Sequence, residues 1–248
     1  MNLSDFFRLH PKVAVAFSGG VDSAYLLYAA GQSGAQVRAY YVQSAFQPRF
    51  ECRDAVRLAE ELGVPLRILS VDVLAEETVA ANPPDRCYHC KQMIFRTILT
   101  AAKEDGFATL LDGTNASDDA DDRPGMRALR ELAVLSPLRE CGLTKAEIRR
   151  LAREAGLFLW NKPAYACLAT RVPTGEQITR EKLEATEAAE DFLFSLGFSD
   201  FRVRRMNGAA RIQVPAEQTG RVLENREKIT AVLKQYYTAV LLDLEARE

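Results

Sequence analysis

The chain has 248 residues, of which 48% are hydrophobic, so it is long enough for one or two domains with filled cores. Its 32 Lys and Arg residues and 34 Asp and Glu residues leave a formal net charge of -2, which would attract neither nucleic acid nor anionic lipid. The sequence shows no targeting segment and no apolar stretch of membrane-spanning length, so we expect a cytoplasmic protein without a membrane partner.

A strand, a glycine turn and a helix are predicted in direct succession near the start of the chain. The apolar run Val13–Phe17 is typical of a buried strand, and Asp22–Gln32 has the apolar spacing of a helix. Glycines in the turn between them let backbone N–H groups approach an anion, and the helix start adds a positive dipole end. This succession predicts a phosphate site. Its expected ligands are Ser18, Gly19, Gly20, Asp22 and Ser23.

The turn sequence, Ser-Gly-Gly-Val-Asp-Ser at 18–23, differs from other phosphate-binding loops. It lacks the spacing and the lysine of a Walker A loop, and it lacks the spacing of a dinucleotide fingerprint. It resembles the SGGxDS loop of the PP-loop ATP pyrophosphatases, which binds the β,γ-pyrophosphate of ATP while a nucleophile attacks the α-phosphorus. The resemblance implies ATP as a ligand and a role for Asp22 in holding Mg²⁺. The alternative is a glycine turn that only caps the helix.

Further strand patterns alternate with helix patterns along the first part of the chain. The strand patterns lie at Val37–Val42, Leu66–Val71 and Thr109–Asp112, and the helix patterns at Glu51–Leu62, Lys91–Glu104 and Thr144–Ala155. Because these strands are nearly all apolar and separated by helices, they predict an α/β fold, a parallel sheet with helices on both faces. Thr144 and Glu147 form a capping-box pattern, and we place a first domain at 1–160. Ligands of such folds bind beyond the carboxyl ends of the strands, where Ser44 and Gly113 lie.

A smaller α+β domain is predicted at 161–248, where the apolar pattern changes. Its expected elements are a long helix at Thr179–Leu196, two strands at Phe201–Met206 and Ala209–Val214, and a last strand at Thr238–Leu244. The two central strands flank Asn207-Gly208, the strongest short-range signal for a two-residue type I′ turn. A turn of this kind determines which residues of the two strands lie opposite each other.

The register of this hairpin sets two arginines against each other. Counting back from the turn, Arg204 lies opposite Arg211, and Arg202 lies opposite Gln213. Like charges directly opposite each other destabilise a hairpin, so a phosphate that bridges the guanidinium groups would account for the pair. The alternative is an arginine face in contact with water.

The five cysteines, an odd number, argue against a disulfide framework and favour metal or catalytic use of some thiols. Cys87 and Cys90 form a CxxC at the start of a helix-like stretch, and Cys167 lies near the predicted domain junction. Three converging thiols could hold a zinc ion with a fourth ligand, or the CxxC could act alone in redox chemistry. A 4Fe-4S cluster on the three thiols would instead leave one iron open to sulfide. Cys52 and Cys141 are expected to be buried or incidental thiols.

Six motifs together resemble the LarE family of ATP-dependent sulfur transferases over nearly the whole chain. They are Val-Ala-Phe-Ser-Gly-Gly-Val-Asp-Ser at 15–23, Asp112-Gly113-Thr114-Asn115, Asp122-Arg123-Pro124-Gly125, Trp160-Asn161-Lys162-Pro163, Ala166-Cys167-Leu168-Ala169-Thr170-Arg171 and Arg202-Val203-Arg204. The resemblance implies an enzyme that uses ATP to activate a carboxylate of pyridinium-3,5-biscarboxylic acid mononucleotide as an acyl-adenylate. Sulfur then replaces oxygen, with release of AMP, in the biosynthesis of a nickel-pincer cofactor.

The resemblance also implies two kinds of sulfur source. In one branch of the family, a single cysteine at the position of Cys167 gives up its own sulfur. The other branch adds a CxxC, here Cys87 and Cys90, and uses a 4Fe-4S cluster on the three thiols to carry sulfide from an external source. This chain resembles the second branch. The family further implies a homo-oligomer, with a hexamer as one form.

The resemblance assigns the mononucleotide phosphate to Arg202 and Arg204, in agreement with the anion inferred from the hairpin register. Arg211, opposite Arg204, is expected to share that anion. Gln213 occupies a place where relatives often carry Glu, and this departure puts an acid or metal role there in doubt.

The remaining implied roles concern ATP. Ser44 and Gly113 would lie near the adenosine, and Arg123 would stabilise negative charge on the adenylate or the leaving pyrophosphate. The acidic run at 118–122 could bind Mg²⁺, and Lys162 could screen the adenylate or assist sulfur transfer. The alternatives are a turn and cap after Gly113, a surface turn at Arg123, a solvated loop for the acidic run and a surface cation for Lys162.

Two other functions fit parts of the pattern. A tRNA-thiolating or amidating PP-loop enzyme shares the glycine loop, but we expect it to carry an added RNA-binding or glutaminase module, for which the chain has no room. A non-catalytic module that binds an iron–sulfur cluster or zinc, and uses ATP only as a regulator, would release no pyrophosphate.

Overall fold

The computed structural model describes residues 2–118 and 124–247, so the predicted site residue Arg123 lies outside the described residues. The chain divides into two compact units. The first unit contains Met1–Val73 and Asp85–Lys162, and the second contains Leu74–Pro84 and Pro163–Glu248. Within the described ranges, no helix is both long enough and apolar enough to cross a membrane.

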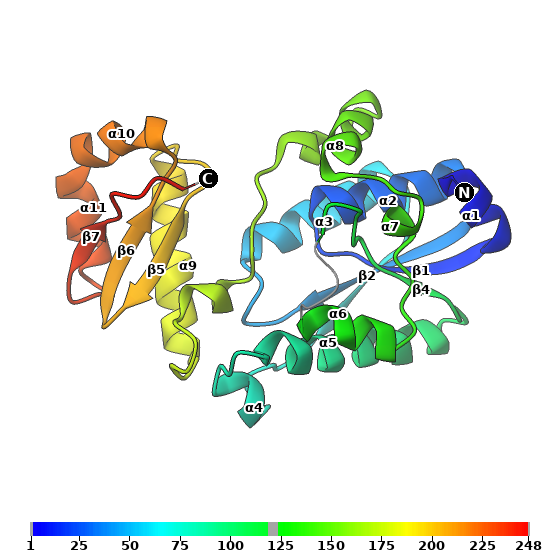
Figure 1. Cartoon of the computed structure of the whole chain (residues 1–248), viewed down its shortest axis with the longest axis horizontal. Coiled ribbons are helices and arrows are strands. Elements are labelled where there is room, and N and C mark those ends of the chain that lie inside the picture. The colour runs from blue at the N-terminus through cyan, green and yellow to red at the C-terminus, as the bar shows by residue number, and fades with distance from the viewer. Residues whose placement is uncertain (1, 119–123, 248) are drawn as a thin grey trace. The chain divides into compact units, whose positions relative to one another are not determined.

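A four-stranded parallel sheet forms the centre of the first unit (Figure 1). Its strands are β1 (Lys12–Ala16), β2 (Gln36–Gln43), β3 (Leu66–Ser70) and β4 (Leu110–Leu111). They lie in the order β3-β2-β1-β4, and each neighbouring pair is parallel. The predicted parallel sheet is confirmed. The fourth strand is shorter than the pattern at 109–112 indicates, because only two of its residues pair with β1.

The helices of the first unit include all four that the apolar patterns predict. The described helices are α1 (Leu3–Leu9), α2 (Val21–Gln32), α3 (Arg49–Glu61), α5 (Arg86–Glu104), α6 (Pro124–Glu131), α7 (Pro137–Glu140), α8 (Lys145–Glu154) and the 3-10 helix η1 (Phe158–Asn161). The helix predicted from Lys91 begins more than a turn earlier, so the CxxC lies inside it. The predicted capping box of Thr144 and Glu147 is present. Three helices, α1, α6 and α7, are too short to establish a helical period in the sequence.

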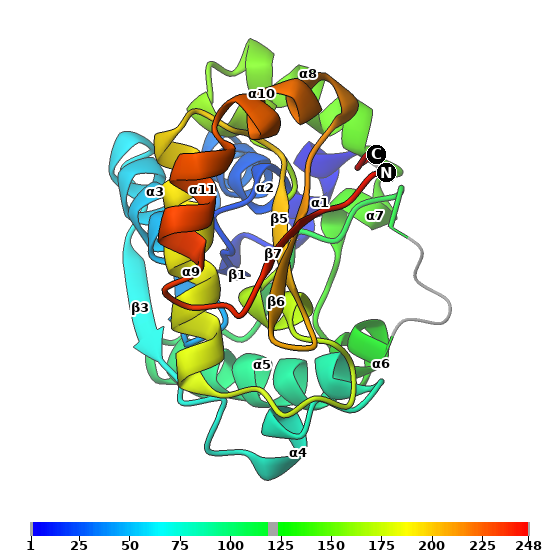
Figure 2. The same ribbon diagram turned by 90° about the vertical axis from the view of Figure 1, so that its left-hand side faces the viewer.

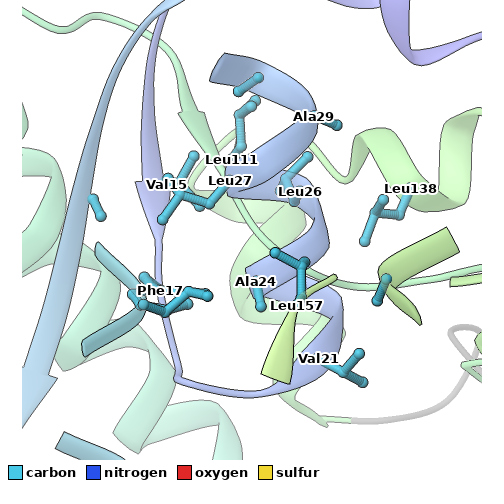
Figure 3. Close-up of a cluster of buried hydrophobic side chains, with 14 of the residues drawn as sticks. Val15, Phe17, Val21, Ala24, Leu26, Leu27, Ala29, Leu111, Leu138 and Leu157 are labelled. Atoms are coloured by element: carbon cyan, nitrogen blue, oxygen red, sulfur yellow. The ribbon is translucent and has the colours of Figure 1, made fainter. Parts of the chain in front are cut away.

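Successive side chains of β1 enter two different hydrophobic cores. Val13 and Val15 belong to a cluster with residues of α1, α2 and α8, whereas Ala14 belongs to a cluster with residues of α5 and α6. Figure 3 shows Val15 beside Leu27 of α2 in the first of these clusters. Because alternate residues of a strand point to opposite faces, both faces of the sheet are covered by helices, as predicted.

The second unit is a small α+β structure around a three-stranded sheet. Its described elements are α4 (Glu77–Ala80), η2 (Leu168–Arg171), α9 (Arg180–Ser195), β5 (Arg202–Met206), β6 (Ala209–Gln213), η3 (Ala216–Gln218), α10 (Thr219–Glu224), α11 (Arg226–Leu233) and β7 (Val240–Leu242). The strand order is β5-β6-β7, with β5 antiparallel and β7 parallel to β6. Helices α9 and α11 lie beside this sheet (Figure 2) and share one hydrophobic cluster with it.

The hairpin of the second unit has the predicted turn and the predicted register. Asn207 has a φ of 52° and Gly208 a φ of 82°, and a type I′ turn requires positive φ at both central residues. Arg204 lies opposite Arg211, and Arg202 lies opposite Gln213. The Asn-Gly signal in the sequence was therefore sufficient to determine how these two strands pair.

The segment Leu74–Pro84 belongs to the second unit, although its sequence neighbours on both sides belong to the first. Asn82 holds it there. This buried residue has a φ of 57°, and its side-chain amide donates to the carbonyl of Pro173 at 2.7 Å. Its own carbonyl accepts from the backbone N–H of Gly175 at 2.8 Å. The predicted division into 1–160 and 161–248 does not include this crossing of Leu74–Pro84 into the second unit. The contacts that hold the segment join residues about 91 positions apart, which no local sequence pattern relates.

Candidate nucleotide-binding and sulfur-transfer sites

The loop after β1 has the geometry expected of a phosphate site. The hydroxyls of Ser18 and Ser23 lie 3.1 Å apart and close the loop, and Ser23 Oγ also donates to the carbonyl of Gly20 at 3.1 Å. Gly20 is the N-cap residue of α2 and provides no side-chain acceptor for the first N–H groups of that helix. These N–H groups are therefore available to an anion.

Two glycines allow close backbone packing around this loop. Gly19 has a φ of 75°, and a Cβ built there would lie 2.9 Å from the carbonyl oxygen of Glu51 in α3. A Cβ at Gly113 would lie 2.9 Å from the backbone nitrogen of Ser23. The structure thus places the predicted residue Gly113 directly beside the glycine loop, where only a residue without a side chain fits.

The two carboxylate oxygens of Asp22 have different surroundings. Oδ2 forms an ion pair with Nζ of Lys145, the first residue of α8. Oδ1 is buried and has no hydrogen-bond partner among the described residues. A buried carboxylate oxygen without a partner costs free energy, and it is a ligand that a hard cation such as Mg²⁺ prefers. The donor at Asp22 therefore fits the predicted Mg²⁺ site.

Two lysines bring positive charge to this loop. Lys162 Nζ donates to the carbonyl of Gly19 at 3.1 Å and to Oδ2 of Asp54 at 2.7 Å, and its side chain is only 14% exposed. Lys162 is therefore not the surface cation of the alternative interpretation. Lys145 was missed by the sequence analysis. The available signal was its place in the first turn of a helix, where the dipole disfavours a cation unless an anion lies nearby.

The residues after β4 form a compact turn. The buried carboxylate of Asp112 accepts hydrogen bonds from Ser136 Oγ at 2.6 Å and from the hydroxyl of Thr114. Asn115 Oδ1 accepts the backbone N–H of Ser117 at 2.8 Å. Thr114 and Asn115 thus stabilise local structure, as the turn-and-cap alternative expects.

Ser44 follows β2 at the carboxyl edge of the sheet. Its hydroxyl donates to Oε1 of Gln47 at 2.6 Å and accepts the backbone N–H of Phe46 at 3.2 Å. The side chain is therefore used in a local turn. Its position beyond the end of a parallel strand is the one predicted for a nucleotide site, and its contact with adenosine stays a prediction.

The CxxC lies in the first turns of α5. Cys87 is exposed and Cys90 is half-buried, and their spacing places them on one face of the helix. Tyr88, between them, holds this end of α5 against α6. Its hydroxyl donates to Oε2 of Glu131 at 2.7 Å, and the guanidinium of Arg127 lies 3.7 Å from the centre of its ring.

The five cysteines lie within the described residues and form no disulfide. Burial raises the pKa of the Cys52 and Cys141 thiols, which pack against the first core, and this fits incidental thiols. Cys87 and Cys90 belong to the first unit and Cys167 to the second. In the described ranges, no three His, Cys, Asp or Glu side chains form a group that could hold a metal ion. A shared site for the three thiols stays a prediction.

Arginine side chains hold the loop that carries Cys167. Arg202 donates through Nη2 to the carbonyl of Ala164. Arg204 donates through Nη1 to the carbonyl of Thr170 at 2.7 Å. The residues that the sequence assigns to phosphate binding are therefore bonded to the backbone on both sides of the cysteine.

Positive charge exceeds negative charge around these arginines. Burial, together with the nearby charges of Arg171 and Arg247, lowers the pKa of Arg202 to about 10. Burial also lowers the pKa of Arg204, and Arg171 adds to that effect. Asp200 lies 4.0 Å from Arg202 and pairs more closely, at 2.9 Å, with Arg247. An anion bound by Arg202 and Arg204 would compensate this charge.

Arg211 forms an ion pair with a carboxylate that the register of the hairpin does not predict. Its Nε lies 3.5 Å from Oδ2 of Asp243, just after β7. Gln213 joins the two opposed arginines, because it accepts from Arg204 Nε at 2.7 Å and donates to Asp243 at 2.8 Å. The repulsion inferred from the hairpin is thus partly relieved within the protein, and a share of Arg211 in anion binding stays a prediction.

Comparison with known proteins first defines the class. A family model described as Queuosine biosynthesis protein QueC matches residues 12–83, which include β1 and the glycine loop. The tRNA-specific 2-thiouridylase MnmA of Thermotoga petrophila is 28% identical over 193 residues, covering 61% of this chain and 54% of that protein. Together with the parallel sheet and the Ser-Gly-Gly-Val-Asp-Ser loop, these similarities define a PP-loop enzyme that uses ATP.

Two further relatives match almost the whole chain. Pyridinium-3,5-bisthiocarboxylic acid mononucleotide synthase of Lactiplantibacillus plantarum is 36% identical over 238 residues, covering 94% of this chain and 86% of that protein. An uncharacterized protein of Synechocystis sp. is 35% identical over 251 residues, covering 98% of this chain and 92% of that protein. The chain therefore belongs to the LarE family and is an ATP-dependent sulfurtransferase.

Proposed function

We propose that this enzyme transfers sulfur to a carboxylate of pyridinium-3,5-biscarboxylic acid mononucleotide in the biosynthesis of a nickel-pincer cofactor. The relative named for the corresponding bisthiocarboxylic acid product supports this, because its similarity covers 94% of the chain. The similarity to the tRNA thiouridylase covers only 61% of the chain, which favours a small-molecule substrate over tRNA.

ATP is proposed to bind at the glycine loop, with its phosphates at the start of α2 and Mg²⁺ on Asp22. The observation that carries this proposal is the buried Asp22 oxygen without a partner, beside a loop with the family sequence. Bound Mg²⁺ would neutralise part of the triphosphate charge. Lys145 and Lys162 would supply further positive charge where pyrophosphate departs.

The first chemical step is the attack of a substrate carboxylate oxygen on the α-phosphorus of ATP. A P–O bond forms to the substrate as the bond to pyrophosphate breaks, which gives the acyl-adenylate. This step converts a poor oxygen leaving group into AMP, a good one. Charge on the departing pyrophosphate would be stabilised by the helix start and by the two lysines.

The second unit is proposed to bind the mononucleotide. Arg202 and Arg204 would hold its phosphate, with Arg211 beside them, because these guanidinium groups carry more positive charge than the nearby carboxylates compensate. Each guanidinium presents five N–H donors, of which only some are used by the protein, so donors are left for phosphate oxygens.

Cys87, Cys90 and Cys167 are proposed to hold a 4Fe-4S cluster that receives sulfide from an external source. Three thiols fit three cluster ligands, and a cluster bound in this way leaves one iron that can carry sulfide. In the second chemical step, sulfur bonds to the acyl carbon as the bond to AMP breaks. The alternative is that Cys167 gives up its own sulfur.

Anaerobic reconstitution with iron and sulfide tests these proposals. The reconstituted enzyme is incubated with ATP, Mg²⁺ and the biscarboxylic mononucleotide, and pyrophosphate, substrate mass and protein mass are measured. We expect pyrophosphate release together with oxygen-to-sulfur exchange in the substrate and an unchanged protein mass. Loss of one sulfur from Cys167 would establish the sacrificial route instead, and absence of pyrophosphate release would contradict the proposed reaction.

Three variants separate the parts of the mechanism. Asp22→Asn is expected to abolish pyrophosphate release, because it removes the charge proposed to hold Mg²⁺. Cys87→Ser is expected to retain pyrophosphate release but to lose repeated sulfur transfer. Cys52→Ser, which changes a partly buried thiol packed against the first core, is the control and is expected to retain both.

We also propose a cytoplasmic homo-oligomer, with a hexamer as the form that the family resemblance suggests. Size-exclusion chromatography with light scattering measures the mass in solution. A monomer at all protein concentrations would contradict the oligomer without affecting the proposed chemistry.

A further inference from the structure

One buried carboxylate in the second unit collects four hydrogen bonds. Glu190, in α9, is 1% exposed and accepts from Arg171 through Nε at 2.8 Å and Nη2 at 3.1 Å. The hydroxyl of Tyr165 donates to its Oε2. The backbone N–H of Val203, in β5, donates to its Oε1 at 2.9 Å. Glu190 therefore joins three segments of the chain: the loop before η2, η2 itself and the first strand of the hairpin.

On one side, this network extends to Cys167. Arg171 donates through Nη1 to the carbonyl of Ala166 at 3.0 Å and to the hydroxyl of Thr170 at 2.8 Å. The Thr170 hydroxyl in turn donates to the carbonyl of Cys167 at 2.9 Å, and the Thr170 N–H donates to the same carbonyl at 3.0 Å. The backbone around the cysteine is thus held by a continuous chain of hydrogen bonds that starts at Glu190.

On the other side, the network extends to the proposed phosphate ligands. Val203 lies between Arg202 and Arg204, so the hydrogen bond from its N–H to Glu190 sets the position of the strand from which both side chains project. Arg204 also donates to the carbonyl of Thr170 in the cysteine loop. One carboxylate therefore holds both the cysteine loop and the arginine strand.

We propose that Glu190 is a positioning residue that couples occupation of the anion site at Arg202 and Arg204 to the order of the loop around Cys167. The inference rests on the proposed function, which assigns the mononucleotide phosphate to these arginines. An anion that immobilises the two guanidinium groups also immobilises the loop carbonyls to which they donate. Because Glu190 prevents the strand and the loop from moving apart, the loop becomes more ordered when the anion binds.

This role differs from plain stabilisation. A buried ion pair contributes little more stability than apolar residues of similar volume would, because both charges lose their water. What apolar residues could not reproduce is the set of directed bonds to Val203, Tyr165 and Arg171. The decisive measurement is therefore the response of the loop to an anion and not the stability of the protein.

The test uses hydrogen exchange of the full-length enzyme, followed by mass spectrometry of peptides that contain residues 164–172, with inorganic phosphate as the probe. In the wild-type enzyme, saturating phosphate is expected to slow exchange of this loop by about threefold to tenfold. Calorimetry measures phosphate binding in parallel, and Arg202→Gln is expected to abolish both the binding and the slowing.

Two variants weaken the network to different degrees. Tyr165→Phe removes one donor to Glu190 and keeps the ion pair, so it is expected to fold even if Glu190→Gln does not. In both variants we expect phosphate still to bind but no longer to slow exchange of the loop. Glu184→Gln, an exposed residue of α9, is the matched control and is expected to behave as the wild-type enzyme does.

The outcomes distinguish this inference from the proposed function. If phosphate slows exchange of the loop equally in the wild type, Tyr165→Phe and every folded Glu190→Gln sample, the coupling role is overturned while the phosphate site stands. If the wild type binds no phosphate, the phosphate assignment fails and the coupling role is overturned with it, because the loop then has no anion to respond to. Calorimetry therefore tells the two failures apart, because phosphate binding is kept in the first outcome and absent in the second.

Discussion

Lys145 places its ammonium group against Asp22 at the start of α8, where the helix dipole alone would favour an anion. We expect Lys145→Gln to lower kcat/KM for ATP by roughly tenfold to a hundredfold, because a charged donor near the departing pyrophosphate is lost. Pyrophosphate release over a range of ATP concentrations measures this change. Lys103→Gln alters an exposed lysine in the last turn of α5 and is the control. Equal values for the two variants would contradict the role of Lys145.

Gly19 and Gly34 have nearly the same backbone conformation but different surroundings. Their φ angles are 75° and 73°, and a Cβ at Gly34 would meet nothing within 4 Å, whereas at Gly19 it would lie 2.9 Å from the Glu51 carbonyl. Gly34→Ala is expected to cost about 1–2 kcal/mol of unfolding free energy for the left-handed conformation. Gly19→Ala is expected to cost about 1–3 kcal/mol more, because backbone atoms must move.

Urea unfolding of the two alanine variants measures this difference. The cost of the left-handed conformation is common to both variants. The additional loss of unfolding free energy in Gly19→Ala therefore measures the close approach of α3 to the glycine loop. Equal losses would show that α3 can move away from the loop without cost, and the close contact would then have no part in shaping the nucleotide site.

At the scale of secondary-structure elements, α5 is tied to the sheet at its carboxyl end. Asp105, the C-cap residue, accepts hydrogen bonds or ion pairs from Arg38 at 2.9 Å, Tyr40 Oη at 2.9 Å and Arg67 at 3.1 Å. The hydrogen bonds from Arg38 and then Tyr40 lower the pKa of Asp105 to about 2. Strands β2 and β3 and the helix that carries the CxxC at its other end are therefore joined by one carboxylate.

The lowered pKa of Asp105 predicts a pH dependence of stability. The unfolded chain binds a proton at this group near its ordinary pKa of about 3.9, whereas the folded chain does so only near 2. The contribution is therefore complete above about pH 4 and is lost as the pH falls toward about 2. We expect Asp105→Asn to be less stable than the wild type at neutral pH and the difference to shrink over this acidic range.

Urea midpoints of the wild type and Asp105→Asn at a series of pH values measure this dependence. Glu61→Gln removes the carboxylate of an exposed ion pair with Arg57 and is the control, for which little change is expected at any pH. A stability difference for Asp105→Asn that stays constant from neutral to acidic pH would contradict the linkage.

At the scale of the whole molecule, each unit has a hydrophobic cluster of its own, yet the second unit is not continuous in sequence. It needs Leu74–Pro84, and Asn82 supplies the amide for carbonyls of Val172, Pro173 and Glu176. Asn82→Gly keeps the left-handed backbone and removes the amide, so we expect it to destabilise the second unit by about 1–3 kcal/mol. Asn82→Ala is expected to cost about 1–2 kcal/mol more because of its φ.

Hydrogen exchange measures which parts of the protein lose stability in the two Asn82 variants. Amides of β5 and β6 are expected to exchange faster in both Asn82 variants, whereas amides of β1 and β2 keep their protection. Equal acceleration in the two sheets would contradict the role of Leu74–Pro84 as part of the second unit.

The sequence itself determined the features that depend only on residues close together along the chain. The strand, glycine turn and helix at 13–32 follow from local apolar spacing and from the backbone freedom of glycine. The register of the hairpin follows from Asn207-Gly208, because a two-residue turn makes the flanking residues direct partners. The same local chemistry indicated a phosphate loop, and the resemblance of its sequence to the SGGxDS loop indicated the class of enzyme.

Only the tertiary structure decided which side chains from distant elements meet. Lys145 reaches Asp22 across 123 positions, and Asn82 reaches Pro173 across 91. Periodic patterns specify which residues share a face of one helix or strand, and they carry no information about the partner that faces it. Glu190 is an example of what the pattern cannot predict. A carboxylate in a helix is expected to be exposed, and only the fold buries this one among donors from three other segments.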